Sequence, residues 1–198
     1  MAITQEMPIF PLGSVLFPGG RLGLRIFEPR YVEMAKRCLR EQTVFGVALI
    51  RAGFEVGKPA IPWDWGCTAR IADWQMPAPD HYSLRARGEQ RFRIRRRWAL
   101  DSELLMAEVE LAEPPEPLPL PPSYALLGQL LGDLIEELGA ERFPQPARLD
   151  DTAWVAYRLA ELMPVLPERQ QALLELEQPL QLLEAVTRLV QQLPDEAR

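Results

Sequence analysis

Hydrophobic and polar residues alternate through much of the first 112 residues. The clearest run is Leu105 to Leu111, where apolar residues take every second position. This spacing is typical of a β-strand that buries one face. Similar runs occur at Leu22 to Ile26, Val44 to Ile50, Cys67 to Ile71 and Leu84 to Ala86. The pattern predicts six or seven short strands.

One helix is expected among these strands. Pro29 suits the first position of a helix, and apolar side chains follow at helical spacing on one face at Tyr31, Ala35, Cys38 and Leu39. The regular alternation of strand and helix that builds a parallel sheet is missing. The strands therefore favour a small closed or half-closed barrel.

Two segments in this half are interpreted as breaks between strands. Pro59 to Gly66 reads as a loop, which would expose Trp63 and Trp65. Arg87 to Gln90 reads as a turn, after which the extended segment Gln90 to Leu100 would fold back on the preceding strand.

The second half has the period of helices. Six prolines between Glu113 and Pro122 prevent regular structure there and predict a semi-rigid spacer. Leucine stripes after Ser123 and after Asp151, together with Pro167 and Pro179 at helix starts, predict a bundle of four amphipathic helices. The predicted organisation is a β-barrel unit over residues 1–116, a linker over 117–122 and a helical bundle over 123–198. The fold class is α+β.

Composition sets limits on location and chemistry. The chain is 47% hydrophobic and 25% charged, as in ordinary globular proteins. Its longest apolar run, Val44 to Ile50, is too short to cross a membrane, and the N-terminus lacks a secretory signal pattern. We therefore expect a cytoplasmic protein with no membrane contact. Cys38 and Cys67 are expected to be buried free thiols, and one histidine cannot complete a zinc site.

No catalytic residue, metal site or cofactor site is predicted. None of the four serines lies in a nucleophile elbow, and His81 lies in a polar, proline-flanked stretch that reads as a loop. Paired acids such as Asp150 and Asp151 suit a helix N-terminus without any catalytic role. The chain is not expected to be an enzyme.

Five segments resemble, in order, the N-terminal domain family of Lon proteases. They include a Phe-Pro-Gly turn, a Gly-x-x-Ala-x-Ile strand and a Gly-x-x-Arg-Phe-x-Ile strand. The segments are Pro8 to Gly19, Leu24 to Tyr31, Phe45 to Leu49, Gly66 to Ile71 and Gly88 to Ile94. The resemblance implies a PUA-like pseudobarrel followed by a helical bundle. The 198 residues contain no segment similar to the ATPase or protease domains of Lon, so it also implies a module that contacts unfolded or tagged proteins without cutting them. Its expected partners are such clients, with a protease or chaperone as a further partner.

Aromatic side chains are the candidate contacts for a client. A barrel with an open side offers strand edges and apolar grooves that suit extended peptides, and each buried contact contributes about 1.5 to 3 kcal/mol. The competing interpretation is that most of these rings fill the core. The candidates are Phe17, Phe27, Tyr31, Trp63, Trp65 and Trp74.

A row of arginines supports an alternative function. Seven arginines fall between Arg85 and Arg97, and a period of two would place four of them on one solvent-facing strand surface: Arg91, Arg93, Arg95 and Arg97. Such a row could bind RNA phosphates, and the PUA-like fold that the resemblance implies has RNA-binding relatives. The net charge of -6 and pairing with Glu108 and Glu110 argue against it. A third interpretation is a structural homodimer through the leucine-rich bundle.

Overall fold

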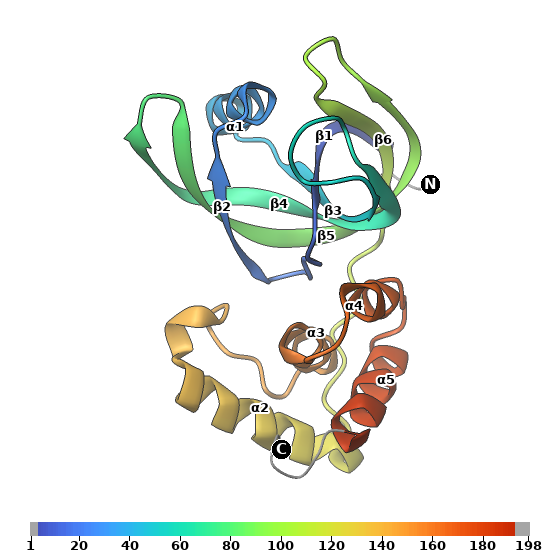
Figure 1. Ribbon diagram of the computed structural model, residues 1–198. Coiled ribbons are helices and arrows are strands. Elements are labelled where there is room, and N and C mark those ends of the chain that lie inside the picture. Colours follow the sequence, from blue (N-terminus) through green and yellow to red (C-terminus); the bar gives the residue numbers. More distant parts are fainter. Residues whose placement is uncertain (1–3, 193–198) are drawn as a thin grey trace. The chain divides into compact units, whose positions relative to one another are not determined.

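The computed structural model describes residues 4–192, and the chain divides into two compact units, Met1–Glu113 and Pro114–Arg198. As the sequence predicted, the fold is α+β (Figure 1). The first unit comprises β1 (Thr4–Leu12), β2 (Arg21–Ile26), α1 (Pro29–Glu41), β3 (Phe45–Ala52), β4 (Ile61–Ala78), β5 (His81–Ala99) and β6 (Leu105–Leu111).

The strands of the first unit close into a barrel. Their order is β2-β5-β4-β3-β1-β6, and β5 also pairs with β6, which completes a ring of five strands with β2 outside it. The first half of β5 pairs with β2 and its second half with β6. All pairs are antiparallel except β1 with β3. β2 is therefore an edge strand of the described sheet, with a partner strand on one side only.

β4 and β5 are long strands, contrary to two of the predictions above. The stretch Pro59 to Gly66 is not a loop, because β4 begins at Ile61. The segment Arg87 to Gln90 is not a turn but part of the continuous strand β5. The local turn-forming residues are overridden by pairing of β5 with strands on both sides.

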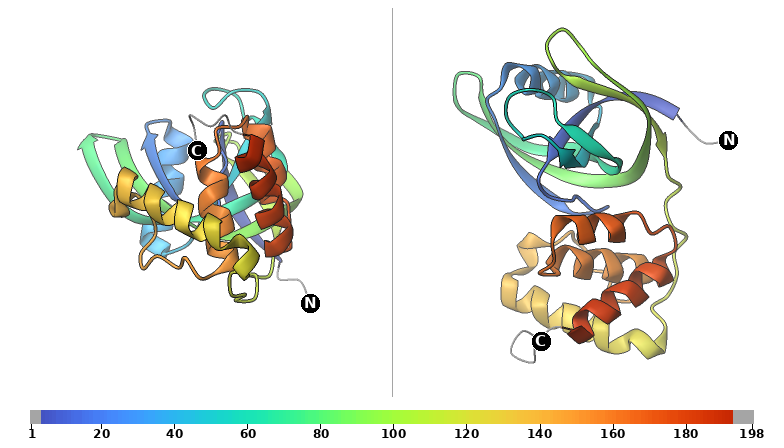
Figure 2. Two further views of the ribbon diagram at one scale, coloured as in Figure 1. Left: turned by 90° about the horizontal axis from the view of Figure 1, so that it is seen from below. Right: turned by 45° about the vertical axis from the view of Figure 1, so that its right-hand side comes forward.

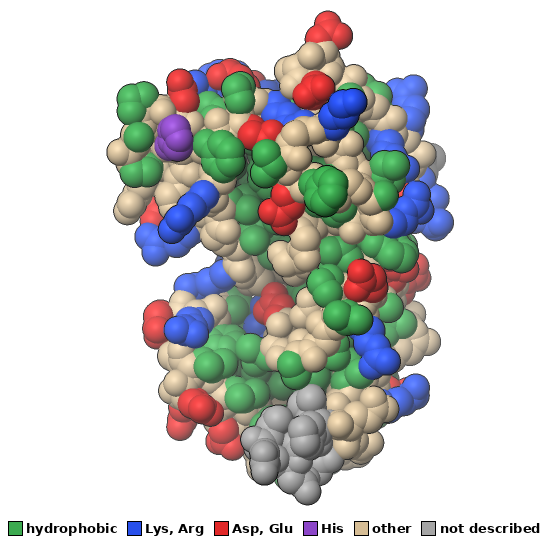
Figure 3. Space-filling view, in the orientation of Figure 1, with side chains coloured by type: hydrophobic (Ala, Val, Ile, Leu, Met, Phe, Trp, Pro, Cys, Tyr) green, Lys and Arg blue, Asp and Glu red, His purple; other side chains and the backbone are tan. Residues whose placement is uncertain are grey.

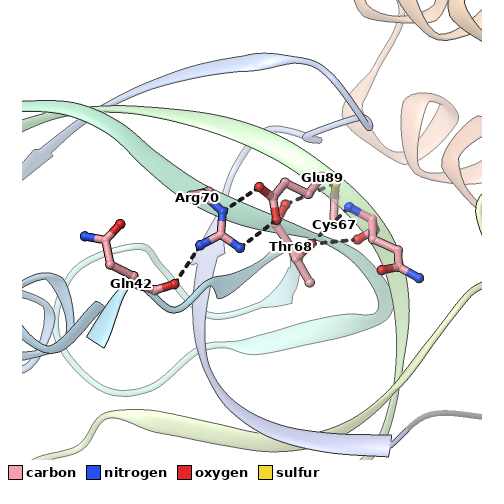
Figure 4. Close-up of polar contacts among 6 residues, drawn as sticks. Gln42, Cys67, Thr68, Arg70 and Glu89 are labelled. Carbon is pink, nitrogen blue, oxygen red and sulfur yellow. Dashed lines mark hydrogen bonds and ion pairs between the residues drawn. The ribbon is translucent and has the colours of Figure 1, made fainter. Parts of the chain in front are cut away.

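A bulge takes the place of the expected turn (Figure 4). The register shifts from Cys67 opposite Arg91 to Ala69 opposite Gly88. The hydroxyl of Thr68 accepts from the N–H of Gln90 at 3.0 Å and lies 3.2 Å from its carbonyl oxygen, so it satisfies the interrupted ladder. Bulges bend and twist the strand that carries them. This bend lies between the part of β5 that meets β2 and the part that meets β6.

One wall of the barrel depends on glycines. The ring of Phe92 on β5 is fully buried against Gly46 on β3 and Gly66 on β4. A Cβ at Gly66 would lie 2.5 Å from that ring and 2.4 Å from the carbonyl oxygen of Val47. Only glycine leaves room for Phe92 on these neighbouring strands.

The helix α1 covers another side of the barrel. It buries Tyr31, Val32, Met34, Ala35 and Cys38 in a core to which all six strands contribute. The thiols of Cys38 and Cys67 are both buried and free, as expected. The core therefore needs no disulfide.

The second unit is helical, as predicted. Among the described residues it contains two short 3-10 helices, η1 (Pro122–Tyr124) and η2 (Ala140–Arg142). Its four α-helices in this described part are α2 (Ala125–Leu138), α3 (Thr152–Leu162), α4 (Pro167–Leu174) and α5 (Pro179–Gln192). α3 contacts α2, α4 and α5 and lies at the centre of this unit (Figure 2). The carboxylate of Asp151 accepts the N–H of Trp154 at 2.7 Å and caps α3.

The proline-rich segment belongs to this unit. The N–H of Leu120 donates to the carbonyl of Asp150 at 2.7 Å, and that of Thr152 to Leu118 at 2.9 Å. The predicted linker thus contacts the residues that lead into α3. The last six residues of the predicted bundle, 193–198, lie outside the described residues. Within residues 4–192, no helix has the length and apolar character that a membrane span requires.

Candidate functional site

A groove of about 350 Å³ runs along β2 in the first unit. Its walls come from β1, from β2 and the start of α1, and from the loop between β3 and β4. On the face shown in Figure 3, hydrophobic side chains gather over the first unit, in the upper part of the view, around a hollowed surface. The lining includes Phe10, Leu12, Phe27, Tyr31, Glu55 and Val56.

The groove exposes the edge of β2. Five consecutive strand residues, from Leu22 to Ile26, line it. Successive side chains point to opposite faces of a strand, so a groove lined by all five must meet the backbone edge. Among the described strands, β2 pairs only with β5. A Cβ at Gly23 would meet no atom within 4 Å, so the exposed face of β2 is open at this position.

Aromatic rings form the floor of the groove. The rings of Phe10 and Tyr31 lie 4.2 Å apart, and both residues are less than 10% exposed. The guanidinium of Arg30 lies 4.7 Å from the centre of the Tyr31 ring. It is buried, donates to Glu28 at 2.9 Å and to the carbonyl of Glu103 at 3.3 Å. These contacts fix the start of α1 and hold the Tyr31 ring in place.

The rim of the groove is apolar and acidic. Phe27 is 53% exposed and Val56 is 61% exposed. Glu55 accepts the N–H of Gly13 at 2.6 Å, which ties the β3–β4 loop to the end of β1. Exposed apolar side chains beside a hollow commonly mark a binding surface.

Electrostatics at the floor reflect this acidic rim. Burial raises the pKa of the Tyr31 hydroxyl above its usual value, and the nearby Arg30 charge opposes that rise. The carboxylates of Glu28 and Glu55 raise the same pKa further. Both acids therefore act on the Tyr31 ring at the floor of the groove, and Arg30 opposes them.

The predicted aromatic contacts differ in burial and in whether they line the groove. Phe27 and Tyr31 line the groove together. Phe17 is fully buried just before β2, in agreement with the competing interpretation that such rings fill the core. Trp63 and Trp65 are partly buried residues of β4 outside the groove, and Trp65 lies against the guanidinium of Arg91 at 5.7 Å.

Trp74 lies on a separate exposed surface. It belongs to the β4–β5 hairpin, is 47% exposed and contacts the ring of Tyr82 at 5.8 Å. The tip of the hairpin is near the groove rim, since His81 stacks on Phe27 with ring centres 6.4 Å apart.

Sequence reasoning missed the β3–β4 loop and the strand edge. Val56 and Glu55 lie in a glycine-rich stretch that reads only as a turn, and nothing in their spacing predicts contact with β2. Gly23 lies within a regular apolar alternation, so the sequence also did not predict the open space next to it. The signal that was present is the alternation of β2 itself, with Arg21, Gly23 and Arg25 as its exposed positions.

The four arginines do not form one exposed row. Arg91 is 4% exposed, contrary to the prediction. A register shift between Ile94 and Arg96 breaks the period of two. Arg95 pairs with Glu110, as the competing interpretation expected, and Arg97 lies 3.4 Å from Asp64. Among residues 4–192, no cluster of His, Cys, Asp and Glu could hold a metal ion.

The barrel and the helical unit define an α+β fold, and comparisons with known proteins give its family. The model of the ATP-dependent protease La (LON) substrate-binding domain matches residues 6–192. The chain belongs to this family.

Relatives of known sequence are proteases of much greater length. The chain is 36% identical over 94 residues to Lon protease 2 of Myxococcus xanthus, which covers 46% of this chain and 11% of that protein. It is 32% identical over 113 residues to the Lon protease of Anaeromyxobacter dehalogenans (strain 2CP-C), covering 56% and 13%. The chain thus matches only about a tenth of each protease.

Solved structures match nearly the whole chain. The crystal structure of a Lon N-terminal domain protein from Xanthomonas campestris aligns with a TM-score of 0.78 and 35% identity, covering 96% of this chain and 99% of that one. The N-terminal domain of the Mycobacterium avium complex Lon protease aligns with a TM-score of 0.64 and 16% identity, covering 95% and 99%. The second likeness shows the fold alone.

Proposed function

We propose that this protein is a non-catalytic module that binds extended, apolar segments of unfolded proteins in the groove along β2. The observation that carries the proposal is the combination of an aromatic floor with an exposed apolar rim. Phe27 and Val56 stand at the rim and remain more than half exposed. Family membership supports a protein ligand, because the matching family is named for substrate binding.

The size of the groove suits weak recognition. An apolar side chain that becomes fully buried contributes about 1.5 to 3 kcal/mol. Two such contacts, at the Tyr31 floor and the Phe27 rim, contribute about 3 to 6 kcal/mol, which is no more than the lower part of the range for the cost of association and so favours weak, transient binding. A module of this strength can hold many different clients.

The test uses a permanently unfolded protein as probe. Reduced and carboxymethylated α-lactalbumin, labelled with a fluorophore, is titrated with the full chain and followed by anisotropy. Phe27→Ser should weaken binding about tenfold, a loss of about 1.4 kcal/mol. Leu100→Ser is the matched control, because Leu100 is 43% exposed and lies outside the groove lining. It should change the affinity less than twofold.

Two results would contradict the proposal. One is an equal loss of affinity in Phe27→Ser and Leu100→Ser, which would point to general surface stickiness. The other is cleavage of the probe during incubation with the purified chain, which would require a catalytic site.

A further inference from the structure

The open edge of β2 has an arrangement of backbone groups that goes beyond an apolar groove. At the start of the strand, Gly88 of β5 donates to the carbonyl of Gly20 at 2.9 Å and accepts from the N–H of Gly19 at 2.8 Å. In an antiparallel ladder, the residues that face the partner strand alternate with those that face away.

This alternation assigns the backbone groups of β2. Counting from Gly88, every second residue of β5 faces β2, and the register places Leu24 opposite Leu84. Leu24 therefore directs its N–H and C=O to β5. The exposed residues on either side of it, Gly23 and Arg25, direct their N–H and C=O groups to the groove.

The side chains next to this edge suit an added strand. A strand paired beside β2 would point every second side chain to the floor formed by Phe10 and Tyr31 and the others to solvent. Gly23 carries no side chain and the space around its Cβ direction is empty, so nothing on this face of β2 hinders an incoming backbone. An exposed edge beside apolar pockets is the arrangement by which many domains capture extended peptides.

Charge indicates the composition of the occupant. The groove is lined by two carboxylates, Glu28 and Glu55, and by one guanidinium, Arg25. Arg30 neutralises Glu28 from beneath the floor at 2.9 Å. Glu55 has one oxygen bound to the N–H of Gly13 and carries a charge at the rim with no ion pair among the described residues. A basic side chain on the ligand complements it.

We propose that a client segment adds to β2 as an extra strand, with apolar residues at alternate positions and a basic residue beside Glu55. This inference rests on the proposed function and specifies how the groove selects its clients. Hydrogen bonds to Gly23 and Arg25 supply affinity that does not depend on the client sequence. The alternating pockets then select segments with a period of two over helical ones.

Backbone methylation of a defined peptide tests the proposal. The probe is an acetylated and amidated eight-residue peptide with a lysine at its amino end, followed by alternating leucine and threonine. One version is N-methylated at the leucines and another at the threonines. Only one of these sets can direct its N–H groups to β2, so the two versions should differ at least tenfold in affinity for the full chain. Replacing the lysine with glutamate should weaken binding severalfold.

Amide exchange gives an independent readout. In the complex with the unmethylated peptide, exchange at Gly23 and Arg25 should slow at least tenfold, while Leu24, bonded to β5, should change little. Equal affinities of the two methylated peptides, or unchanged exchange at Gly23 and Arg25, would overturn strand addition. Those results would leave the groove as a binding site if Phe27→Ser still weakens the parent peptide. Loss of that Phe27 effect would instead remove the proposed function.

Discussion

Two sides of the same barrel use glycine in opposite ways. On the wall formed by β3, β4 and β5, the space above Gly46 and Gly66 is filled by the ring of Phe92. On the side formed by β2, the space beside Gly23 is empty. The wall is a packed interior and the β2 side is a place where another chain can approach. A glycine within a strand is therefore informative only when its neighbours are known.

The contrast also divides the segments that carry the family resemblance between the wall and the groove. Of the segments that carry the resemblance, Gly66 to Ile71 and Gly88 to Ile94 build the wall. A Cβ at Gly88 would lie 2.3 Å from the carbonyl oxygen of Phe17, so the Phe-Pro-Gly turn packs directly on this strand. These motifs build the wall, whereas the groove is lined mainly by two other segments of the resemblance, Pro8 to Gly19 and Leu24 to Tyr31, with Val56 and Glu55 from outside them.

The largest difference is expected between two phenylalanines. Phe92→Ala should reduce the free energy of unfolding of the first unit by about 4 kcal/mol, because a fully buried ring leaves a cavity. Phe27→Ala should change it by about 0.5 kcal/mol or less, since half of that ring is already exposed. Residue-resolved hydrogen exchange at barrel amides measures both values. Similar losses in the two variants would contradict the division into packed wall and open side.

A pair of glycines gives the next largest contrast. Gly66→Ala should cost about 3 kcal/mol, because its Cβ meets the backbone oxygen of Val47, which cannot move without disturbing β3. Gly23→Ala should be within about 0.5 kcal/mol of the wild type. Thermal unfolding of the two variants under identical conditions provides the comparison. Equal stability of both would mean that the wall relaxes more easily than its contacts indicate.

Much of the fold could be predicted from the sequence, because period-two and helical spacing record which side chains are buried. The start of α1 at Pro29 and of α4 at Pro167 agrees with the structure. Long-range pairing could not be predicted in this way. The bulge at Thr68 depends on a partner strand, and so does the continuity of β5 through Gly88.

The candidate site was predicted only in part, for the same physical reason. Phe27 and Tyr31 could be proposed because aromatic side chains are natural contacts for an extended peptide in an open barrel. Val56 and Glu55 reach the groove through a loop whose path the sequence does not specify. The loop that was expected to expose Trp63 and Trp65 is instead part of β4, where strand pairing leaves both side chains partly buried.

Buried and open environments can also be compared through acids of the second unit. Burial raises the pKa of Glu161 to about 7, although the Arg158 charge and its hydrogen bond oppose the shift. An acid whose folded pKa is raised lowers stability as the pH rises from its unfolded pKa to its folded pKa. We expect this group to cost about 2 kcal/mol between pH 5 and pH 7, and little more above pH 8.

The measurement is urea unfolding at pH 5, 6, 7 and 8. Glu161→Gln should remove the decrease, so its advantage over the wild type should grow across this range. Glu168→Gln is the control, because Glu168 lies exposed on α4. A constant difference between Glu161→Gln and the wild type at all four pH values would show that the carboxyl group titrates normally.

Filling the open side should affect binding more than stability. Gly23→Leu places a branched side chain on the exposed face of β2, next to the position of an added strand, without meeting neighbouring atoms at Cβ. The variant should bind unfolded α-lactalbumin about tenfold more weakly, equivalent to about 1.4 kcal/mol. Its thermal stability should stay within the range of the wild type. Unchanged affinity in a folded Gly23→Leu protein would place the ligand elsewhere.

The smallest effect is expected on the arginine-rich half of β5. Arg95 pairs with Glu110 at a partly exposed position, so Arg95→Ala should cost about 0.5 kcal/mol of stability. Since the charge is already neutralised within the protein, the variant should bind the unfolded probe and single-stranded RNA as the wild type does. Filter binding at several salt concentrations tests the RNA alternative.

A phosphate contact has a distinct signature in that assay. Each neutralised phosphate of a single strand contributes a slope of about -0.7 to the logarithmic dependence of affinity on salt. We expect the dependence of RNA affinity on salt to be the same in Arg95→Ala as in the wild type. If the wild type does show it and the variant loses it, the Arg95–Glu110 pair opens for phosphate. The binding surface would then lie where β5 pairs with β6, and the contrast with the groove along β2 would be reversed.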